Sequence, residues 1–273
     1  MAGGTDLVVG ARQGKAPLPE HLVAIDRLDE LRSVREADET VRIGALATHA
    51  EIAAHPLVRD RFTALADAAA IIGSHATRAQ GTIGGNLMNA SPAMEAGGPL
   101  LCFDASVVLR SASGSRALGV ADLLAGPGQT TAAPDELLEA VEVRVPGEST
   151  GSCYLRLEYR RQMEIAVVGA TAVLTLDGGR VVDARVAITA LAPTIRRVPE
   201  AERALLGTDA GPAAAQEAAQ LAADGAEPIS DVRASARYRQ AMAVVITRRA
   251  IAIAAARGRG EDVPVPANMA MTA

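Results

Sequence analysis

Two short segments of the chain place adjacent glycines among small polar side chains. The first is AGGTDL, Ala2 to Leu7, and the second is TIGGN, Thr82 to Asn86. Residues without a Cβ let the backbone approach a ligand closely and turn several N–H groups toward one anion. Hydroxyl, amide and carboxyl side chains in the two segments add polar contacts. We therefore expect an extended, phosphate-bearing ligand to lie between them; two unrelated tight turns are the alternative.

Three other patterns indicate chemistry less strongly. GPGQTT falls short of the dinucleotide-binding GxGxxG turn because Thr131 replaces its last glycine, and GARQGKA lacks the Ser or Thr that follows the lysine of a P-loop. On a helix, His49 and His55 would point about 120° away from each other, which disfavours a shared metal ion. We expect GPGQTT to be a loop and both histidines to lie on the surface.

The composition excludes several classes of protein. The 273 residues are 49% hydrophobic and 22% charged, with no run of eighteen apolar residues and no secretion signal at the N-terminus. Disorder and a membrane span are therefore not expected, and the cytoplasm is the expected location. A net charge of -5 disfavours binding to nucleic acid, which needs a positive field. Two cysteines, Cys102 and Cys153, are too few to ligate an iron–sulfur cluster.

The elements around the two glycine pairs are predicted to be mixed helices and strands. LVAID (22–26) and TVRIGA (40–45) indicate short strands. Thr48 and Glu51 have the spacing of a capping box at the start of a helix, THAEIAAHPLV. An Ala-rich helix over 61–73 leads to the second glycine pair, which we expect in a loop.

Beyond Pro146 the pattern changes. Residues 165–191 alternate with period two around the turn DGG, which is typical of an antiparallel hairpin. Two amphipathic helices are predicted within 211–225 and 235–257. Strands and helices occur in mixed order without sustained βαβ alternation, so the sequence predicts an α+β fold.

Several long segments resemble one protein family. They are AGGTDLVVGARQGKAPLPEHLVAIDRLDELRSV, VRIGALATHAEIAAHP and IIGSHATRAQGTIGGNLMNASPAMEAGGPLLCFDASVVL, together with the pattern that starts at YRRQMEIAVVGA. They resemble the FAD-binding medium subunit, or middle domain, of the molybdenum hydroxylases, a group that includes xanthine dehydrogenase and aerobic carbon monoxide dehydrogenase. The resemblance implies a PCMH-type fold of two FAD-binding subdomains, at 1–48 and 49–147. An antiparallel sheet with helices follows at 151–257, and then a flexible tail, 258–273.

The resemblance also implies which residues contact FAD. Leu31 would line the adenine side, and Arg156 would lie near the pyrimidine end of the flavin, where positive charge favours the reduced, anionic form. Glu95 stands where the family has an aspartate, so it would contact the ribityl or ribose part. The other expected FAD contacts are Ala2, Gly3, Gly4, Thr5, Asp6, Leu7, Ile72, Gly73, Thr82, Gly84, Gly85, Asn86 and Asn89.

The function implied by the resemblance is electron transfer. A substrate is oxidised at the molybdopterin of a large partner subunit. The electrons pass through the 2Fe–2S clusters of a small partner subunit to the FAD of this chain, and then to NAD or another acceptor. FAD would be bound noncovalently, so His75, although close to the second glycine pair, is not expected to anchor it, and no side chain is expected to act as a catalytic acid or base.

Two alternatives remain open. One is a stand-alone flavin-dependent oxidoreductase, and the other is a structural subunit that has lost FAD. The second is motivated by a departure from the family. Family members have a strand and a helix ahead of the first glycine pair, whereas Met1 directly precedes it here. We therefore expect the first subdomain to be truncated and its loop to lack a supporting strand.

Overall fold

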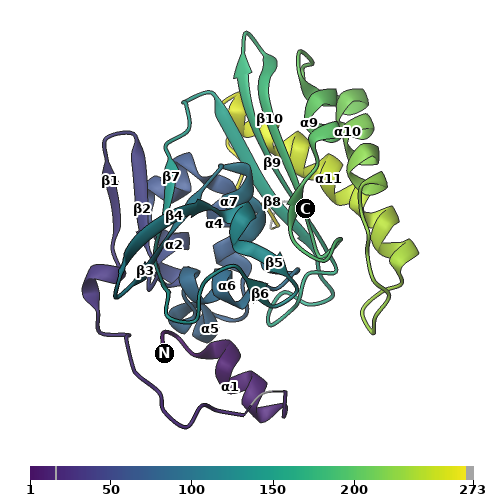
Figure 1. The fold of residues 1–273 in the computed structure, drawn as a ribbon. Coiled ribbons are helices and arrows are strands. Elements are labelled where there is room, and N and C mark those ends of the chain that lie inside the picture. The colour runs from purple at the N-terminus through teal and green to yellow at the C-terminus, as the bar shows by residue number, and fades with distance from the viewer. Residues whose placement is uncertain (16, 269–273) are drawn as a thin grey trace.

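The computed structural model describes residues 1–15 and 17–268, which form two main sheets with helices packed around them (Figure 1). One sheet has five strands in the order β1-β2-β7-β3-β4, and the other has four in the order β11-β10-β9-β8. All neighbouring strands in both sheets are antiparallel. The expected α+β class is confirmed. Among the described residues, no helix is long and apolar enough to cross a membrane.

The first glycine segment leads directly into a helix, α1 (Thr5–Arg12), none of whose residues is buried. Residues 22–26 form no strand, so the strand expected at LVAID is wrong. A single 3-10 turn, Asp29–Leu31, follows instead and precedes the first sheet.

The five-stranded sheet joins segments that are far apart in the sequence. Its second strand pairs with a strand about a hundred residues later, in a register that places Thr40 opposite Arg144. The strands of the two expected FAD-binding subdomains therefore share one sheet. In chain order its strands are β1 (Val34–Ala37), β2 (Thr40–Gly44), β3 (Ser106–Ser111), β4 (Gly114–Gly119) and β7 (Leu137–Arg144).

Six helices lie in the chain between β2 and β3. The capping box of Thr48 and Glu51 is confirmed. The helix expected to follow it is broken in two at Pro56, which starts a new helix, and the second glycine pair lies in a helix rather than in a loop. The helices are α2 (His49–Ala54), α3 (Pro56–Arg61), α4 (Thr63–Ile71), α5 (His75–Gln80), α6 (Ile83–Asn89) and α7 (Gly97–Cys102).

The segment GPGQTT lies in a small hairpin between β4 and β7. A short helix, α8 (Val120–Leu123), precedes its two strands, β5 (Leu124–Gly126) and β6 (Gln129–Thr130). Gly128 in the turn has a φ of 69°, a conformation that favours glycine. The glycines of GPGQTT thus form a tight turn between two strands, where we expected a loop.

The C-terminal part contains the predicted antiparallel hairpin. Its turn residues Gly178 and Gly179 have φ values of 54° and 78°, as a tight hairpin turn requires. A helix that was not predicted, α9 (Pro199–Leu205), precedes the two predicted ones. The other elements are β8 (Thr150–Leu157), β9 (Val168–Asp177), β10 (Arg180–Thr189), β11 (Arg196–Arg197), α10 (Pro212–Asp224) and α11 (Ala236–Gly258).

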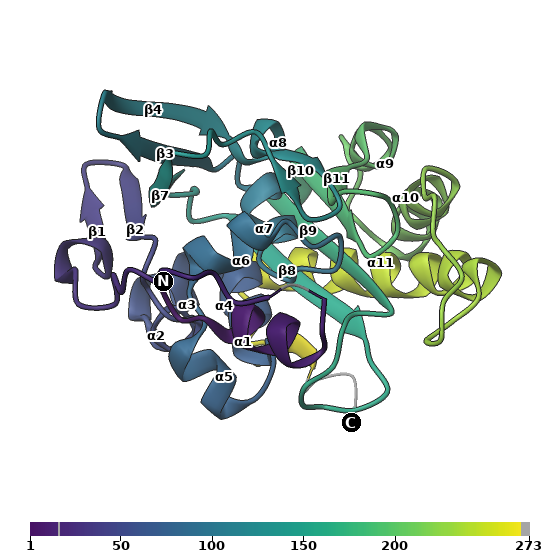
Figure 2. The same cartoon turned by 60° about the horizontal axis from the view of Figure 1, so that its bottom comes forward.

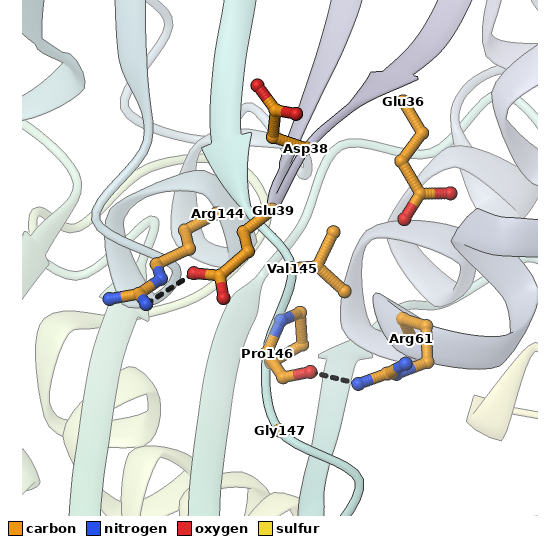
Figure 3. A pocket seen from close by; sticks show the side chains of 8 residues that line it. All are labelled: Glu36, Asp38, Glu39, Arg61, Arg144, Val145, Pro146 and Gly147. Carbon is orange, nitrogen blue, oxygen red and sulfur yellow. Dashed lines mark hydrogen bonds and ion pairs between the residues drawn. The ribbon is translucent and has the colours of Figure 1, made fainter.

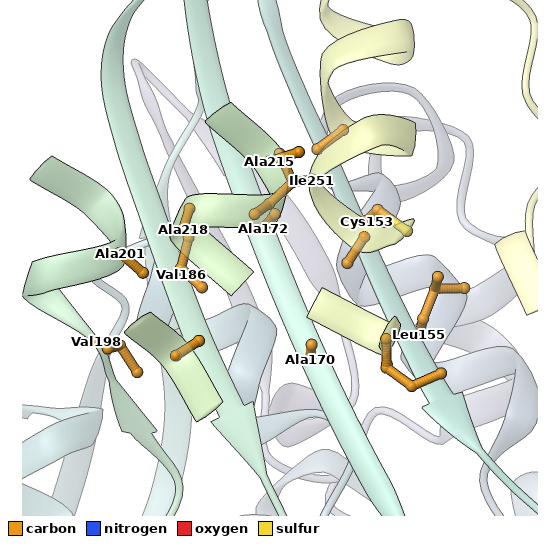
Figure 4. Packing of buried hydrophobic residues seen from close by; sticks show 14 of the residues in the cluster. Cys153, Leu155, Ala170, Ala172, Val186, Val198, Ala201, Ala215, Ala218 and Ile251 are labelled. Carbon is orange, nitrogen blue, oxygen red and sulfur yellow. The ribbon is translucent and has the colours of Figure 1, made fainter. Parts of the chain in front are cut away.

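Small side chains let helices pack closely against the four-stranded sheet. Runs of consecutive buried residues in β8 and β9 show that both faces of the sheet are covered. Helix α11 contacts β8 and β9, whereas α7 from the N-terminal half contacts β9 and β10. Figure 4 shows Ala172 of β9 beside Ala215, Ala218 and Ile251 of the covering helices, with Ala170 further along the same strand.

The segment after α11 packs against the rest of the molecule. The Asp67 carboxylate accepts a hydrogen bond from the Ala267 N–H at 2.7 Å, and Ala267 is fully buried. The Arg257 guanidinium donates both to Asp67 and to the Pro264 carbonyl, each at 2.7 Å. The expected flexible tail, 258–273, lies only partly within the described residues, and the described part is held in this way.

Candidate functional site

The first glycine segment lies against Gln80 and Gly81, the two residues that directly precede the second. A Cβ on Gly3 would be 1.9 Å from the Gln80 carbonyl oxygen and 3.2 Å from the Gly81 Cα, so only glycine allows this approach. A Cβ on Gly81 would in turn lie 3.6 Å from the Thr5 hydroxyl. Figure 2 shows the face of the molecule on which α1 lies. Two segments about eighty residues apart are therefore brought together, as expected for one shared ligand.

The first segment offers main-chain N–H groups that have no acceptor within their helix. Gly4 precedes α1 with a φ of 68°, and no side chain caps the helix. The first hydrogen bond into the helix runs from the Val8 N–H to the Gly4 carbonyl at 3.0 Å. The N–H groups of Thr5, Asp6 and Leu7 precede it and are left over by helix geometry. Such an N-terminus binds anions, because the free donors and the helix dipole both favour negative charge.

The second segment does not offer its main-chain N–H groups, which is a correction to the sequence analysis. The Ile83 and Gly84 N–H groups donate to the Ala47 and Ala45 carbonyls at 3.0 and 2.9 Å. The Gly85 N–H donates to the Thr82 hydroxyl at 3.1 Å, which caps α6.

Packing explains the first glycine of this pair. A Cβ on Gly84 would lie 2.7 Å from the Ala45 Cβ, so this glycine serves the close approach of α6 to the chain after β2. Gly85 and Asn89 are exposed on α6 and can contact a ligand. The helix also presents the side chain of Asn86, whose buried Oδ1 has no hydrogen-bond partner in the described structure.

Glu95 and Arg156, both predicted from the resemblance, form a buried ion pair. The Arg156 side chain is fully buried, and its Nη1 lies 2.5 Å from Glu95 Oε1. Its Nε donates to Glu158 at 2.7 Å, whereas its buried Nη2 has no partner among the described residues. Burial raises the pKa of Glu95, and the charge of Arg156 opposes that rise. The pair links the segment after α6 to β8, and Nη2 is a donor left for a ligand.

Gly73 contacts the loop that follows β8, and Ile72 directly precedes it in the chain. The Gly73 carbonyl accepts a hydrogen bond from the Met163 N–H at 2.9 Å. The Arg156 Nη1 donates to the carbonyl of the next residue, Glu164, at 3.2 Å. These two predicted residues therefore lie on the same side of the site as Arg156.

Leu31 lies beside a pocket of about 490 Å³ that the first glycine segment helps to line. Its carbonyl accepts a hydrogen bond from the N–H of Leu46, a residue of the pocket wall, at 2.8 Å. The pocket is mostly polar, and sequence reasoning missed most of its lining. The lining residues are Ala2, Gly3, Asp26, Arg27, Asp29, Arg32, Leu46, Ala79, Gln80 and Thr82.

Two buried basic residues near the glycine segments were also missed. His49 is 2% exposed, so its expected surface position is wrong, and its Nδ1 has no partner in the described structure. Burial lowers the pKa of His49 to about 4, and the charge of Arg78 adds to this shift. Arg78 is 7% exposed. The only feature of the sequence that could have indicated a role for Arg78 is its position four residues before Thr82, where the second glycine segment begins.

A second pocket, of about 530 Å³, contains none of the predicted site residues (Figure 3). Glu36, Asp38 and Glu39 bring three carboxylates to it from the β1–β2 hairpin. Its two arginines are engaged by the protein: Arg144 pairs with Glu39 at 2.6 Å, and Arg61 donates to the Pro146 carbonyl. This pocket repels an anion and is not a candidate for a phosphate-bearing ligand.

The residues around the two glycine segments fit a dinucleotide that joins a flavin to a pyrophosphate. The free N–H groups at the start of α1 suit the pyrophosphate. The unpartnered donor of Arg156 and acceptor of Asn86 suit the polar edge and hydroxyl groups of such a ligand.

Family models match nearly the whole chain. The model described as the FAD binding domain in molybdopterin dehydrogenase matches residues 1–146, and that of the CO dehydrogenase flavoprotein C-terminal domain matches 154–254. The carbon monoxide dehydrogenase medium chain of Hydrogenophaga pseudoflava is 35% identical over 257 residues, covering 92% of this chain and 87% of the relative. The putative xanthine dehydrogenase FAD-binding subunit of Escherichia coli (strain K12) is 29% identical over 253 residues, covering 92% and 86%.

Solved structures agree with the sequence relatives. Carbon monoxide dehydrogenase from Hydrogenophaga pseudoflava superposes with a TM-score of 0.90 at 34% identity, covering 94% of this chain and 89% of that one. Quinoline 2-oxidoreductase from Pseudomonas putida 86 gives a TM-score of 0.88 at 29% identity, with the same coverage. The chain therefore belongs to the FAD-binding medium subunits of the molybdenum hydroxylases, a family of subunits of oxidoreductase complexes.

Proposed function

We propose that this chain is the electron-transfer subunit of a molybdenum hydroxylase complex in the cytoplasm. It receives electrons from the 2Fe–2S clusters of a small subunit, which take them from a substrate oxidised at the molybdopterin of a large subunit. It then delivers them to NAD or another acceptor. The observation that carries the proposal is the contact between the first glycine segment and the residues directly before the second, Gln80 and Gly81, next to the uncapped start of α1.

The residues of this chain bind and orient the cofactor, and FAD supplies the redox chemistry when bound. The N–H groups at the start of α1 hold the pyrophosphate. Asn86 and the Glu95–Arg156 pair hold the more distant part of the ligand, with Arg156 fixed in place by Glu95 and Glu158. Because Arg156 is fully buried, its positive charge is little screened by water and acts strongly on a nearby flavin.

The cysteines support the assignment of the clusters to a partner. Cys102 and Cys153 are both buried, and burial raises the pKa of each thiol. Iron–sulfur clusters are held by thiolates, four of them in the common types. A pair of buried, neutral thiols does not meet that need.

Co-expression with the genes for the small and large subunits tests this proposal. We expect the chain to co-purify with iron, molybdenum and an equimolar amount of FAD that heat or acid releases from the protein. A colourless chain that still assembles would make it a structural subunit. A monomer that carries FAD and oxidises a substrate of its own would make it a stand-alone oxidoreductase.

A further inference from the structure

Arg78 is a buried cation without a counter-charge. Its Nη1 donates to the Ile72 carbonyl at 2.9 Å, and its Nη2 lies 3.2 Å from His75 Nδ1. Neither partner is negatively charged, and no ion pair with a carboxylate is formed by Arg78 in the described parts, 1–15 and 17–268. A buried guanidinium is costly unless negative charge compensates it. A bound anionic ligand is a natural source of that charge.

A series of hydrogen bonds to main-chain carbonyls connects Arg78 with Arg156. Arg78 holds the Ile72 carbonyl, and the neighbouring carbonyl of Gly73 binds the Met163 N–H. The next residue, Glu164, accepts from Arg156. Burial lowers the pKa of Arg78, and the charge of Arg156 adds to this shift, as expected for two positive charges that repel each other.

The two arginines differ in how their charges are balanced. Arg156 has carboxylate partners in Glu95 and Glu158 and keeps one donor, Nη2, unpartnered. Arg78 has no carboxylate partner, so its charge acts on whatever occupies the site. The local field at the Arg156 end of the site is therefore more positive than Arg156 and its partners alone would make it.

We infer that Arg78 raises the reduction potential of the bound flavin through its positive charge, acting with Arg156 on the flavin's polar edge. This inference rests on the proposed function. Oxidised flavin takes up two electrons from the partner's clusters and one proton from solvent to become a reduced anion. A nearby positive charge stabilises that anion more than the neutral oxidised form and thus raises the potential.

The test is a reductive titration of the full chain loaded with FAD, against a reference dye. We expect Arg78→Gln to weaken binding of reduced relative to oxidised FAD about tenfold, a potential lower by about 30 mV for a two-electron couple. Arg78→Lys keeps the charge and should stay near the wild-type potential. Arg248→Gln is the matched control, because Arg248 is exposed on the outer helix α11.

A second pair of variants decides the question if Arg78→Gln fails to fold or to load. His75 is exposed at the start of α5, where an aspartate is compatible with the helix. His75→Asp places a carboxylate beside Arg78 and should lower the potential, whereas His75→Asn should not. Wild-type potentials in loaded Arg78→Gln or, if that variant is lost, in loaded His75→Asp would overturn the inference. A wild-type chain that binds no FAD would instead contradict the proposed function.

Discussion

Gly3 lies so close to Gln80 that a Cβ at position 3 would be 1.9 Å from the Gln80 carbonyl oxygen. The start of the chain and the α5–α6 junction thus form one surface, although about eighty residues separate them in the sequence. The N–H groups at the start of α1 are placed by this contact.

Gly3→Ala is therefore expected to move α1 away from the α5–α6 junction and to release FAD. Gly10→Ala, in the same helix, is the control, because a Cβ on Gly10 has no atom within 4 Å. Alanine there should stabilise the helix by about 0.5–1 kcal/mol. FAD content after gel filtration checks both variants, and full FAD retention by Gly3→Ala would contradict the contact's role.

The Glu95–Arg156 pair should contribute strongly to the stability of the fold. Glu95→Ala leaves the fully buried Arg156 with Glu158 as its remaining carboxylate, and we expect a loss of about 3 kcal/mol in the free energy of unfolding. The matched variant Glu39→Ala breaks an ion pair whose side chains are 76% and 78% exposed, and should cost at most about 1 kcal/mol. Urea unfolding curves provide the comparison, and equal losses in the two variants would refute this account.

Arg257 should hold the segment after α11. Arg257→Met leaves Asp67, which is 1% exposed, without its cation, and we expect a loss of about 3–5 kcal/mol in the free energy of unfolding. Arg259→Met removes a pair that is about half exposed and should change little. Limited proteolysis should cut the C-terminal segment faster in Arg257→Met, and an unchanged cleavage rate would argue against its anchoring by Asp67.

The lowered pKa of His49 predicts that the folded protein loses stability in acid. Burial lowers the pKa of His49 from 6.5 to about 4, so between these values the unfolded chain binds a proton that the folded chain does not. Stability from this group is present above pH 6.5 and is lost as the pH falls to about 4, by up to about 3 kcal/mol.

Unfolding curves at a series of pH values measure this effect. The difference between wild type and His49→Gln should shrink as the pH falls through that window. His21→Gln, at an exposed position, should follow the wild type throughout. A difference between wild type and His49→Gln that does not vary with pH would show that His49 titrates normally in the folded protein.

Local signals in the sequence predicted those parts of the fold that depend on a few neighbouring residues. The capping box at Thr48 and the hairpin turn at Gly178 and Gly179 follow from hydrogen bonds and backbone angles within a single turn. The second glycine pair was harder to interpret. Glycines usually oppose a helix, but here packing against Ala45 and the Thr82 cap outweigh that preference.

Contacts between distant segments could not be predicted in this way. The pairing of β2 with β7, the burial of His49 and the contact of Gly3 with Gln80 all depend on how far-apart segments pack. Apart from the two glycine segments, the expected FAD contacts therefore came from the family resemblance rather than from local pattern. The structure adds which of the two glycine segments has free N–H groups.

Hydrogen exchange of the FAD-loaded chain and the FAD-free chain tests the central claim most directly. The N–H groups of Thr5, Asp6 and Leu7 lack helix partners, whereas those of residues 83–86 are already bonded within the protein. FAD should slow exchange in peptides that cover the start of α1 and leave the start of α6 nearly unchanged. Slower exchange at α6 with none at α1 would contradict the account.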